Sequence, residues 1–387
     1  MKDLLAFVEA CVNCPDHAYS NRDFYNKIRF LKIDDYRLYY MKAACEYHQK
    51  ELVEIGINNI EKAIDMWGNG VKVDNREMDL LLQDNKTKSV ICHPDFFYCF
   101  DKKYYKLYLL AAQLYARAGM IEKCKGMYNK YYYYAHKINI DSSLREKESI
   151  VVYSFRKFSI YSLQDLTKRE ITLVCPDKMN DPFDSLASYI AGNPERLKRT
   201  CKQFDHVQTQ SECFKHFYIR SFRANKDTYE SDDSILTDKL MWSHYTEGHQ
   251  GFCIKYRIDK SYFNQFDDSK LTFTKLIPVE YNKEMKEISI YEALNTSNSF
   301  AFKDKCWEPE NEVRLLHFSP DCGEDHYPIK LDEKNRLEEI IFGINCNSDA
   351  RELIAKLAPE GCKLFKMTND EEKDIYSLIK RKYRQSE

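Results

Sequence analysis

The residue pattern changes near residue 145, and this change divides the chain into two kinds of structure. Before it, aromatic and apolar residues recur at helical spacing in long segments, of which Tyr36–Trp67 and Tyr104–Tyr128 are the clearest. After it come short apolar runs such as Ser149–Phe155, separated by loops and short helices, which are typical of strands. The sequence therefore predicts an all-α domain over residues 1–145, followed by an α+β domain with a mixed sheet over residues 149–387.

Further elements of the second domain follow from local periodicity. Residues 240–247 predict a helix, and the alternation of Phe252, Ile254, Tyr256 and Ile258 after Gly251 predicts a strand. The basic segment near the C-terminus, which contains "IKRKYR", predicts a final helix.

The two long helical segments resemble each other. Each opens with an aromatic-rich helix that contains an Ala-Ala pair, and the pairs begin at Ala43 and Ala111, 68 residues apart. This spacing is twice the period of tetratricopeptide helix pairs, which is about 34 residues. The first domain thus resembles a short, irregular tetratricopeptide-like array. The resemblance implies a scaffold that binds a protein or peptide partner.

The nearly neutral overall charge argues against binding of nucleic acid or acidic membranes by the surface as a whole. The formal net charge is -2, so nothing draws the chain as a whole toward nucleic acid or acidic membranes. No uncharged apolar run reaches the length of about 18 residues that a membrane helix needs. Fourteen cysteines are scattered without a repeating spacing. These features predict a cytoplasmic protein with free thiols and no membrane association.

Acidic residues recur at every second position in the segment "DKCWEPENEVRLLHF", residues 304–318. In a strand, successive side chains alternate between faces, so these acids would share one face. That face would carry Glu308, Glu310, Glu312 and Arg314. Three carboxylates at this spacing repel one another, and one arginine offsets only part of the repulsion. The pattern therefore predicts either a solvated strand face or a set of acids that surround a positive group.

Three motifs in a fixed order resemble a bacterial family of unknown function. They are Asn180–Phe183 ("NDPF"), Trp242–Tyr245 ("WSHY") with Gly251 shortly after, and Trp307–Arg314 ("WEPENEVR"). The family is marked by an Asn-Asp-Pro-Phe loop, a Trp-Ser-His-Tyr helix end and a Trp-x-x-Glu-x-Glu-x-Arg strand. The resemblance covers about residues 151–345.

The same order is similar to that of ADP-ribosyltransferases, which break the bond between nicotinamide and ribose in NAD. Their transition state develops positive charge on the ribose, and a fixed carboxylate stabilises it. The resemblance implies that NAD is the substrate, that Glu312 is the catalytic acid and that Glu310 orients the acceptor. In this interpretation Glu312→Gln would lower the rate by about 10²–10³-fold. It would spare folding, because relieving the repulsion among the acids offsets whatever Arg314 loses.

The resemblance also implies roles for the other motif residues. Arg156, near the end of the first strand, would grip the phosphates or the ribose, and Tyr245 would stack on the nicotinamide. His244 would bond a ribose hydroxyl as part of the catalytic set. Asn180 and Asp181 would contact the substrate, and Arg314 would either bind it or pair with the acids to hold the strand. A Ser-Thr-Ser triplet, which marks the arginine-type transferases, is absent.

The biological setting follows from the resemblance alone. It implies a toxin or defence effector inside a bacterial cell, in which the helical domain determines which partner is bound. Nucleic acid would enter only as an acceptor, and no metal is expected.

Two other functions remain open. Asp181, His244, Glu310 and Glu312 carry oxygen and nitrogen donors that could hold a divalent metal for phosphodiester cleavage. Alternatively, the chain is a non-enzymatic interaction module, in which the helical domain binds a partner and the α+β domain senses a nucleotide or peptide.

Overall fold

The computed structural model describes residues 25–26, 28–32, 34–68, 105–138, 142–179, 184, 207–282, 299–321, 323–370, 372 and 377–384. The chain forms two compact units. One consists of Met1–Asn139 with Pro194–Cys213, and the other of Ile140–Asn193 with Phe214–Glu387. The sequence predicted one boundary between residues 145 and 149. It did not predict that Pro194–Cys213, which comes later in the chain, belongs to the first unit.

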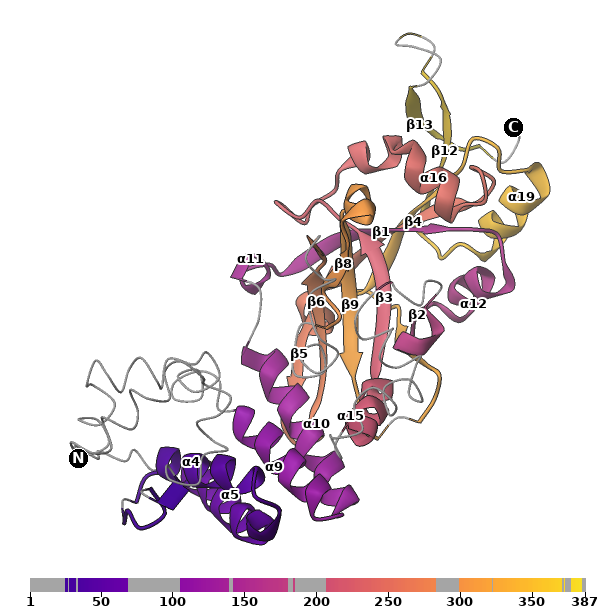
Figure 1. The fold of residues 1–387 in the computed structure, drawn as a ribbon. Helices are drawn as coiled ribbons and strands as arrows, with labels where there is room; N and C mark the ends of the chain where they lie inside the picture. The colour runs from indigo at the N-terminus through magenta and orange to yellow at the C-terminus, as the bar shows by residue number, and fades with distance from the viewer. Residues whose placement is uncertain are drawn as a thin grey trace. The chain divides into compact units, whose positions relative to one another are not determined.

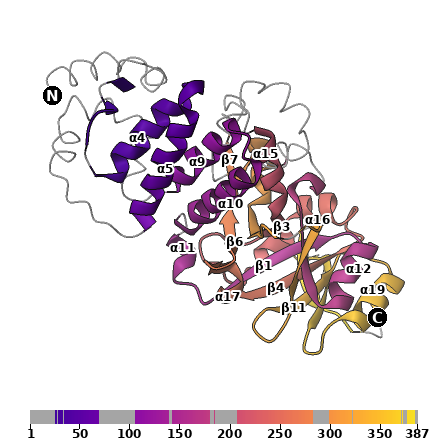
Figure 2. The same ribbon diagram turned by 90° about the horizontal axis from the view of Figure 1, so that it is seen from below.

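The described part of the first unit is helical (Figures 1 and 2). The Asp35 side chain caps the first long helix by accepting the backbone N–H of Arg37 at 2.8 Å. Small residues let the helices approach closely, because a Cβ on Gly56 would lie 2.9 Å from Cδ2 of Leu114. The repeat character of this unit stays a prediction. Its helices are α4 (Tyr36–Tyr47), α5 (Val53–Gly68), α9 (Lys106–Arg117), α10 (Ile121–Ile138) and α15 (Val207–Cys213).

The second unit contains a large sheet that runs, among the described strands, in the order β13-β12-β11-β4-β1-β3-β9-β6-β5. β11 and β12 are parallel and the other pairs are antiparallel, so the sheet is mixed and the chain is α+β. The strands are β1 (Ser149–Arg156), β2 (Glu170–Val174), β3 (Phe217–Arg223), β4 (Phe252–Asp259), β5 (Asn264–Asp267), β6 (Thr272–Pro278), β9 (Glu312–Phe318), β10 (His326–Lys330), β11 (Arg336–Phe342), β12 (Lys363–Asn369) and β13 (Leu378–Lys382).

The sheet forks at β3. On one side, β3 pairs with β9 along its whole length. On the other side, β1 joins near one end, where Tyr153 lies opposite Arg223, and β2 joins near the other, where Val174 lies opposite Ile219. Figure 1 shows β1 running across the direction of β3 and β9. β1 and β2 therefore diverge from a common neighbour, and β2 continues into a pair with β10.

Apolar residues line both faces of this sheet, because strand side chains alternate. On one face Ile150 and Val152 of β1 pack in a core with residues of α12 and α19. On the other face Val151 and Tyr153 pack with Trp242. The helices of this unit are α11 (Ser142–Arg145), α12 (Ile160–Lys168), α16 (Lys239–Tyr245), α17 (Lys260–Phe263) and α19 (Ser348–Leu357).

Gly251 sits where only a glycine fits. A Cβ at this position would lie 2.0 Å from the backbone oxygen of Arg156. The glycine that follows the Trp-Ser-His-Tyr motif thus lets the turn after α16 pack directly onto the end of β1.

The predicted strand over residues 304–318 is only half correct. The strand begins at Glu312, and Lys305–Glu310 form a 3-10 helix, η6. Asp304 caps η6 by accepting the N–H of Cys306 at 2.9 Å, and Asn311 ends it with a left-handed φ of 46°. Asn adopts this conformation more easily than most residues. The alternation predicted for the acids therefore applies to Glu312 and Arg314 but not to Glu308 and Glu310.

The predicted C-terminal helix is wrong, because residues 379–382 of "IKRKYR" belong to β13, which pairs with β12. Alternation explains the strand. Lys380 turns toward Glu339 and Asp233, while its neighbours Ile379 and Arg381 are exposed. Basic residues on an edge strand also oppose pairing with other chains.

Acid should destabilise the second unit through His317 of β9. This histidine is 5% exposed, and burial lowers its pKa from 6.5 to about 4. Between these values the unfolded chain binds the proton and the folded chain does not, so stability falls as the pH is lowered from about 6.5 to 4. The linkage amounts to about 3 kcal/mol. In urea titrations across this range, His317→Gln should reduce the pH dependence, whereas the exposed His326→Gln should leave it unchanged. Equal slopes for both variants would contradict the assignment.

Candidate active site

A lysine lies at the centre of the acids in the second unit. β8 (Phe302–Asp304), which pairs with β7 (Glu280–Asn282), carries Lys303. Its Nζ lies 2.6 Å from Oε2 of Glu310, 3.0 Å from Oε2 of Glu312 and 3.4 Å from Oδ2 of Asp184. Lys303, Glu310 and Glu312 are each less than 5% exposed. The acids thus surround a positive group, which was one of the two arrangements that the sequence left open.

Arg314 is the second cation of this group and is fully buried. Its Nε donates to Oε1 of Glu312 at 2.7 Å, its Nη1 donates to the carbonyl of Phe300 at 3.0 Å, and its Nη2 donates to Asp184. We call Asp184, Lys303, Glu310, Glu312 and Arg314 the charged cluster. Three carboxylates face two cations, so the cluster carries one negative charge in excess.

The cations keep Glu312 ionised. Burial by itself raises the pKa of Glu312, but Arg314 and Lys303 outweigh this effect and hold the pKa at about 2. Burial likewise lowers the pKa of Lys303, and Glu312 and Asp184 more than reverse it. Both groups therefore stay charged at neutral pH. Glu312 is therefore a fixed negative charge at neutral pH.

Aromatic side chains form a rim above the charged cluster. Tyr245, at the end of α16, donates its hydroxyl to Oε1 of Glu310. The centroid of the Trp307 ring lies 5.2 Å from Nζ of Lys303. The His244 ring packs edge-on against the Trp307 ring, with 6.4 Å between the two centroids. Tyr245 and Trp307 are half-buried and His244 is exposed. The second and third sequence motifs therefore meet at one place, with Glu310 on the side of the rim.

Arg156 does not reach this cluster. Tyr153 and Arg223 are partners across β1 and β3, and Arg223 and Glu312 are partners across β3 and β9, so these side chains share a face of the sheet. Arg156 lies three residues after Tyr153 and points to the opposite face. There its Nη2 lies 3.5 Å from Oδ2 of Asp165. The sequence could not show this, because the face depends on which residue pairs with which.

The loop of the first motif reaches the cluster through a residue that the sequence analysis missed. Asn180 and Asp181 lie outside the described residues. Asp184, which directly follows the Asn-Asp-Pro-Phe motif, contacts both Lys303 and Arg314. Its position next to the motif was a usable signal. Lys303 was missed too, and the only hint was that a row of buried acids needs a cation.

A different arginine faces the cluster side of the sheet. Arg223 ends β3 opposite Glu312, and its Nη1 donates to Asp238, the residue that caps α16. Its Nε is buried without a hydrogen-bond partner in the part of the chain that the structure describes. An unpaired guanidinium nitrogen on this face is a donor that a ligand anion could use.

The described residues offer no alternative metal site. Among them, no group of three or more His, Cys, Asp or Glu side chains is placed to hold a metal ion. In the charged cluster, the Lys303 ammonium occupies the position between the carboxylates where a cation would bind.

No helix within the described ranges is both long and apolar enough to cross a membrane.

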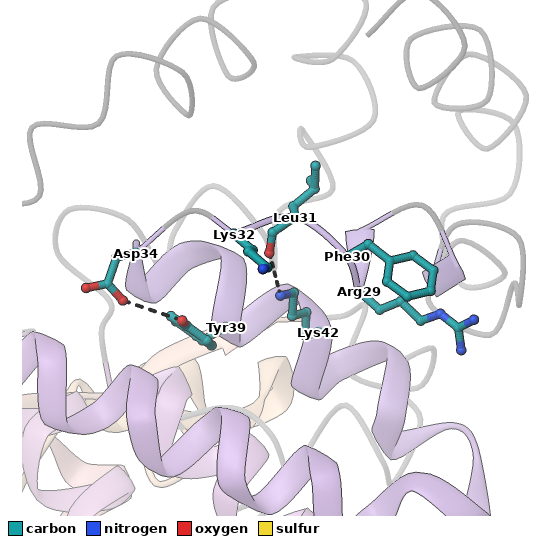
Figure 3. Close-up of a pocket in the computed structure, with 7 residues that line it drawn as sticks. All are labelled: Arg29, Phe30, Leu31, Lys32, Asp34, Tyr39 and Lys42. Atoms are coloured by element: carbon teal, nitrogen blue, oxygen red, sulfur yellow. Dashed lines mark hydrogen bonds between the residues drawn. The ribbon is translucent and has the colours of Figure 1, made fainter.

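A cavity of about 410 Å³ in the first unit is separate from these residues. Figure 3 shows its lining, in which Lys42 donates to the carbonyl of Leu31 at 2.9 Å. None of the site residues predicted from the sequence takes part. The lining residues are Arg29, Phe30, Leu31, Lys32, Asp34, Tyr39 and Lys42.

Comparison with known proteins supports one of the resemblances in coarse form. No curated protein and no solved structure matches the chain significantly. Residues 241–315, which hold the second and third motifs and most of the charged cluster, match the family described as "Protein of unknown function (DUF2971)".

Proposed function

We propose that the second unit cleaves the bond between nicotinamide and ribose in NAD, as an ADP-ribosyltransferase or NAD glycohydrolase. The observation that carries the proposal is the pair Glu310 and Glu312, held by Lys303 and Arg314 beneath the rim of Tyr245 and Trp307. Breaking this bond builds positive charge on the ribose. Carboxylates that are already fixed in a dry site stabilise such charge without reorganising.

The contacts distinguish the two glutamates. Both oxygens of Glu312 bind cations, so its charge is largely used to hold Arg314 and Lys303. Glu310 shares only Lys303, and its other oxygen accepts the Tyr245 hydroxyl at the rim. We therefore assign to Glu310 the role of facing the ribose, which the sequence analysis gave to Glu312. Glu312 becomes the residue that fixes the arrangement.

Other parts of the substrate find partners on the same side. Trp307 and Tyr245 present aromatic surfaces for the nicotinamide ring, and exposed His244 is free to bond a ribose hydroxyl. Arg223 takes the phosphate-binding role predicted for Arg156, because its Nε is unpaired and it lies on the face of Glu312.

The reaction requires few groups. Water, or the hydroxyl or amine of an acceptor, attacks the ribose carbon C1 as its bond to the nicotinamide nitrogen breaks. The electron pair of that bond returns to the ring, so nicotinamide leaves as a neutral molecule. Glu310 accepts the proton that the nucleophile loses and passes it to solvent.

Thermal unfolding with and without ligands tests the proposal. NAD should raise the melting temperature because it binds only the folded state, and a chelator should have no effect. Incubation with NAD should release nicotinamide, while reduced NADH, which lacks the cationic leaving group, should be left intact. A melting temperature that falls with chelator and recovers with a divalent metal would favour the phosphodiesterase alternative. No response to any of these additions would favour the non-enzymatic interaction module.

The first unit fits the part of a partner-binding module in this proposal. Ile55 in α5, Met120 directly before α10 and Ile121 in α10 are each more than 40% exposed, although such side chains are usually buried. We propose that these residues contribute to contact with a protein or peptide.

A further inference from the structure

We infer that Arg156 and Arg220 form a phosphate-binding site at the fork of the sheet, on the face opposite the charged cluster. The site uses none of the residues assigned to NAD cleavage, so it does not depend on that proposal. Its ligand is a phosphate monoester or a diphosphate.

The fork places Arg220 between two diverging strands. Its Nη1 lies 3.3 Å from the carbonyl of Thr172 on β2, and its Nη2 lies 3.3 Å from Oγ of Ser154 on β1. These contacts bridge the two arms where neither arm is paired with β3. Arg156 points to the same face as Ser154, because the two lie two residues apart on β1.

Two guanidinium groups share one carboxylate at this fork. Oδ2 of Asp165 lies 3.5 Å from Nη2 of Arg156 and 3.3 Å from Nη2 of Arg220. The other oxygen, Oδ1, accepts the hydroxyl of Thr172 at 2.6 Å. Within the described part of the chain, neither arginine pairs with another acid. One positive charge is therefore left without a partner in a site where Asp165 is only 2% exposed.

A third donor lies on the same face and has no partner. Tyr256 is opposite Val152 across β4 and β1, so it shares the face of Ser154 and Arg156. It is 1% exposed, and among the described residues its hydroxyl has no hydrogen-bond partner. Burial raises the pKa of this hydroxyl, so it remains protonated and able to donate. Buried polar groups without partners are rare, and such a donor indicates a missing acceptor.

The chemistry of the donors selects the ligand. Burial and the nearby Arg220 lower the pKa of Arg156 to about 10, so the two cations disfavour each other in the absence of an anion. A phosphate group offers three oxygens and up to two charges to planar guanidinium groups, which bind such oxygens in pairs. The Arg156 side chain is 21% exposed, so an anion can reach the site from solvent.

Titration of the full chain with inorganic phosphate and pyrophosphate, followed by calorimetry and thermal unfolding, tests this site. Both anions should bind saturably and raise the melting temperature, and chloride at equal ionic strength should not. Arg156→Gln should weaken binding about 10- to 100-fold, since a charged hydrogen bond is lost. Tyr256→Phe should weaken it about 2- to 10-fold. Lys157→Gln changes the adjacent exposed residue and should bind like the wild type.

The ligand-free variants separate binding from a purely structural role. Removing Arg156 leaves Asp165 paired with Arg220 alone, so the melting temperature without phosphate should be unchanged or higher. A lower value, together with a wild type that responds equally to phosphate and chloride, would identify an ordinary buried ion pair and overturn the inference. Glu310→Gln should retain phosphate binding whether or not NAD is the substrate, which keeps the two proposals distinguishable.

Discussion

Lys303→Met will lower the free energy of unfolding by about 3–5 kcal/mol, because breaking a buried ion pair leaves its partner unpaired. Lys303 is 4% exposed and contacts Glu310, Glu312 and Asp184. Methionine keeps much of the length of the side chain and removes the charge. Glu310 then has no cation among the described residues, and Glu312 and Asp184 depend on Arg314 alone. Urea denaturation at neutral pH measures the loss.

Lys305→Met is the matched control, because Lys305 lies two residues further on and is exposed. Its free energy of unfolding should change by less than about 0.5 kcal/mol. If the two variants have the same stability, Lys303 does not hold the cluster together.

Glu310→Gln will reduce the rate of nicotinamide release by about 10²–10³-fold, the usual cost of removing one electrostatic contact to a transition state. Glutamine has nearly the same shape, and its carbonyl still accepts the Tyr245 hydroxyl. The measurement compares variants at equal folded fraction, with NAD in excess. The rate should therefore fall even after correction for any change in the folded fraction.

Glu308→Gln is the control for this experiment, since Glu308 is exposed in η6 and has no contact with Lys303 or Arg314 within the described residues. Equal rates for Glu308→Gln and Glu310→Gln would rule out the catalytic role of Glu310. Glu312→Gln should lose stability as well as activity, because Arg314 then lacks its main partner. The sequence pattern predicted that this substitution spares folding, because acids in a row repel one another.

Local patterns predicted much of the fold. The alternation after Gly251 predicted β4, and the pattern of the Trp-Ser-His-Tyr segment predicted α16. Local patterns failed where a distant partner decides the outcome. The basic C-terminal segment became β13 because β12 supplies hydrogen bonds and Glu339 accepts Lys380.

The candidate site shows the same limit. Tyr245, Glu310, Glu312 and Arg314 lie together, with Tyr245 at the end of α16, Glu310 at the end of η6 and the other two at the start of β9. The face on which Arg156 lies depends on the register between β1 and β3, which no local signal encodes. Similarly, nothing in the sequence distinguishes Lys303 from the other lysines as the one that enters the cluster.

The path of the chain affects how such a protein could arise or be divided. α15 is assigned to the first unit and contacts α10, although it follows β2 in the chain. Cys213, its last residue, is fully buried. A single recombination breakpoint near residue 145 would therefore separate the helical unit from one of its own helices. Inheritance or transfer of the two units as independent cassettes is disfavoured, and they are expected to travel together through evolution.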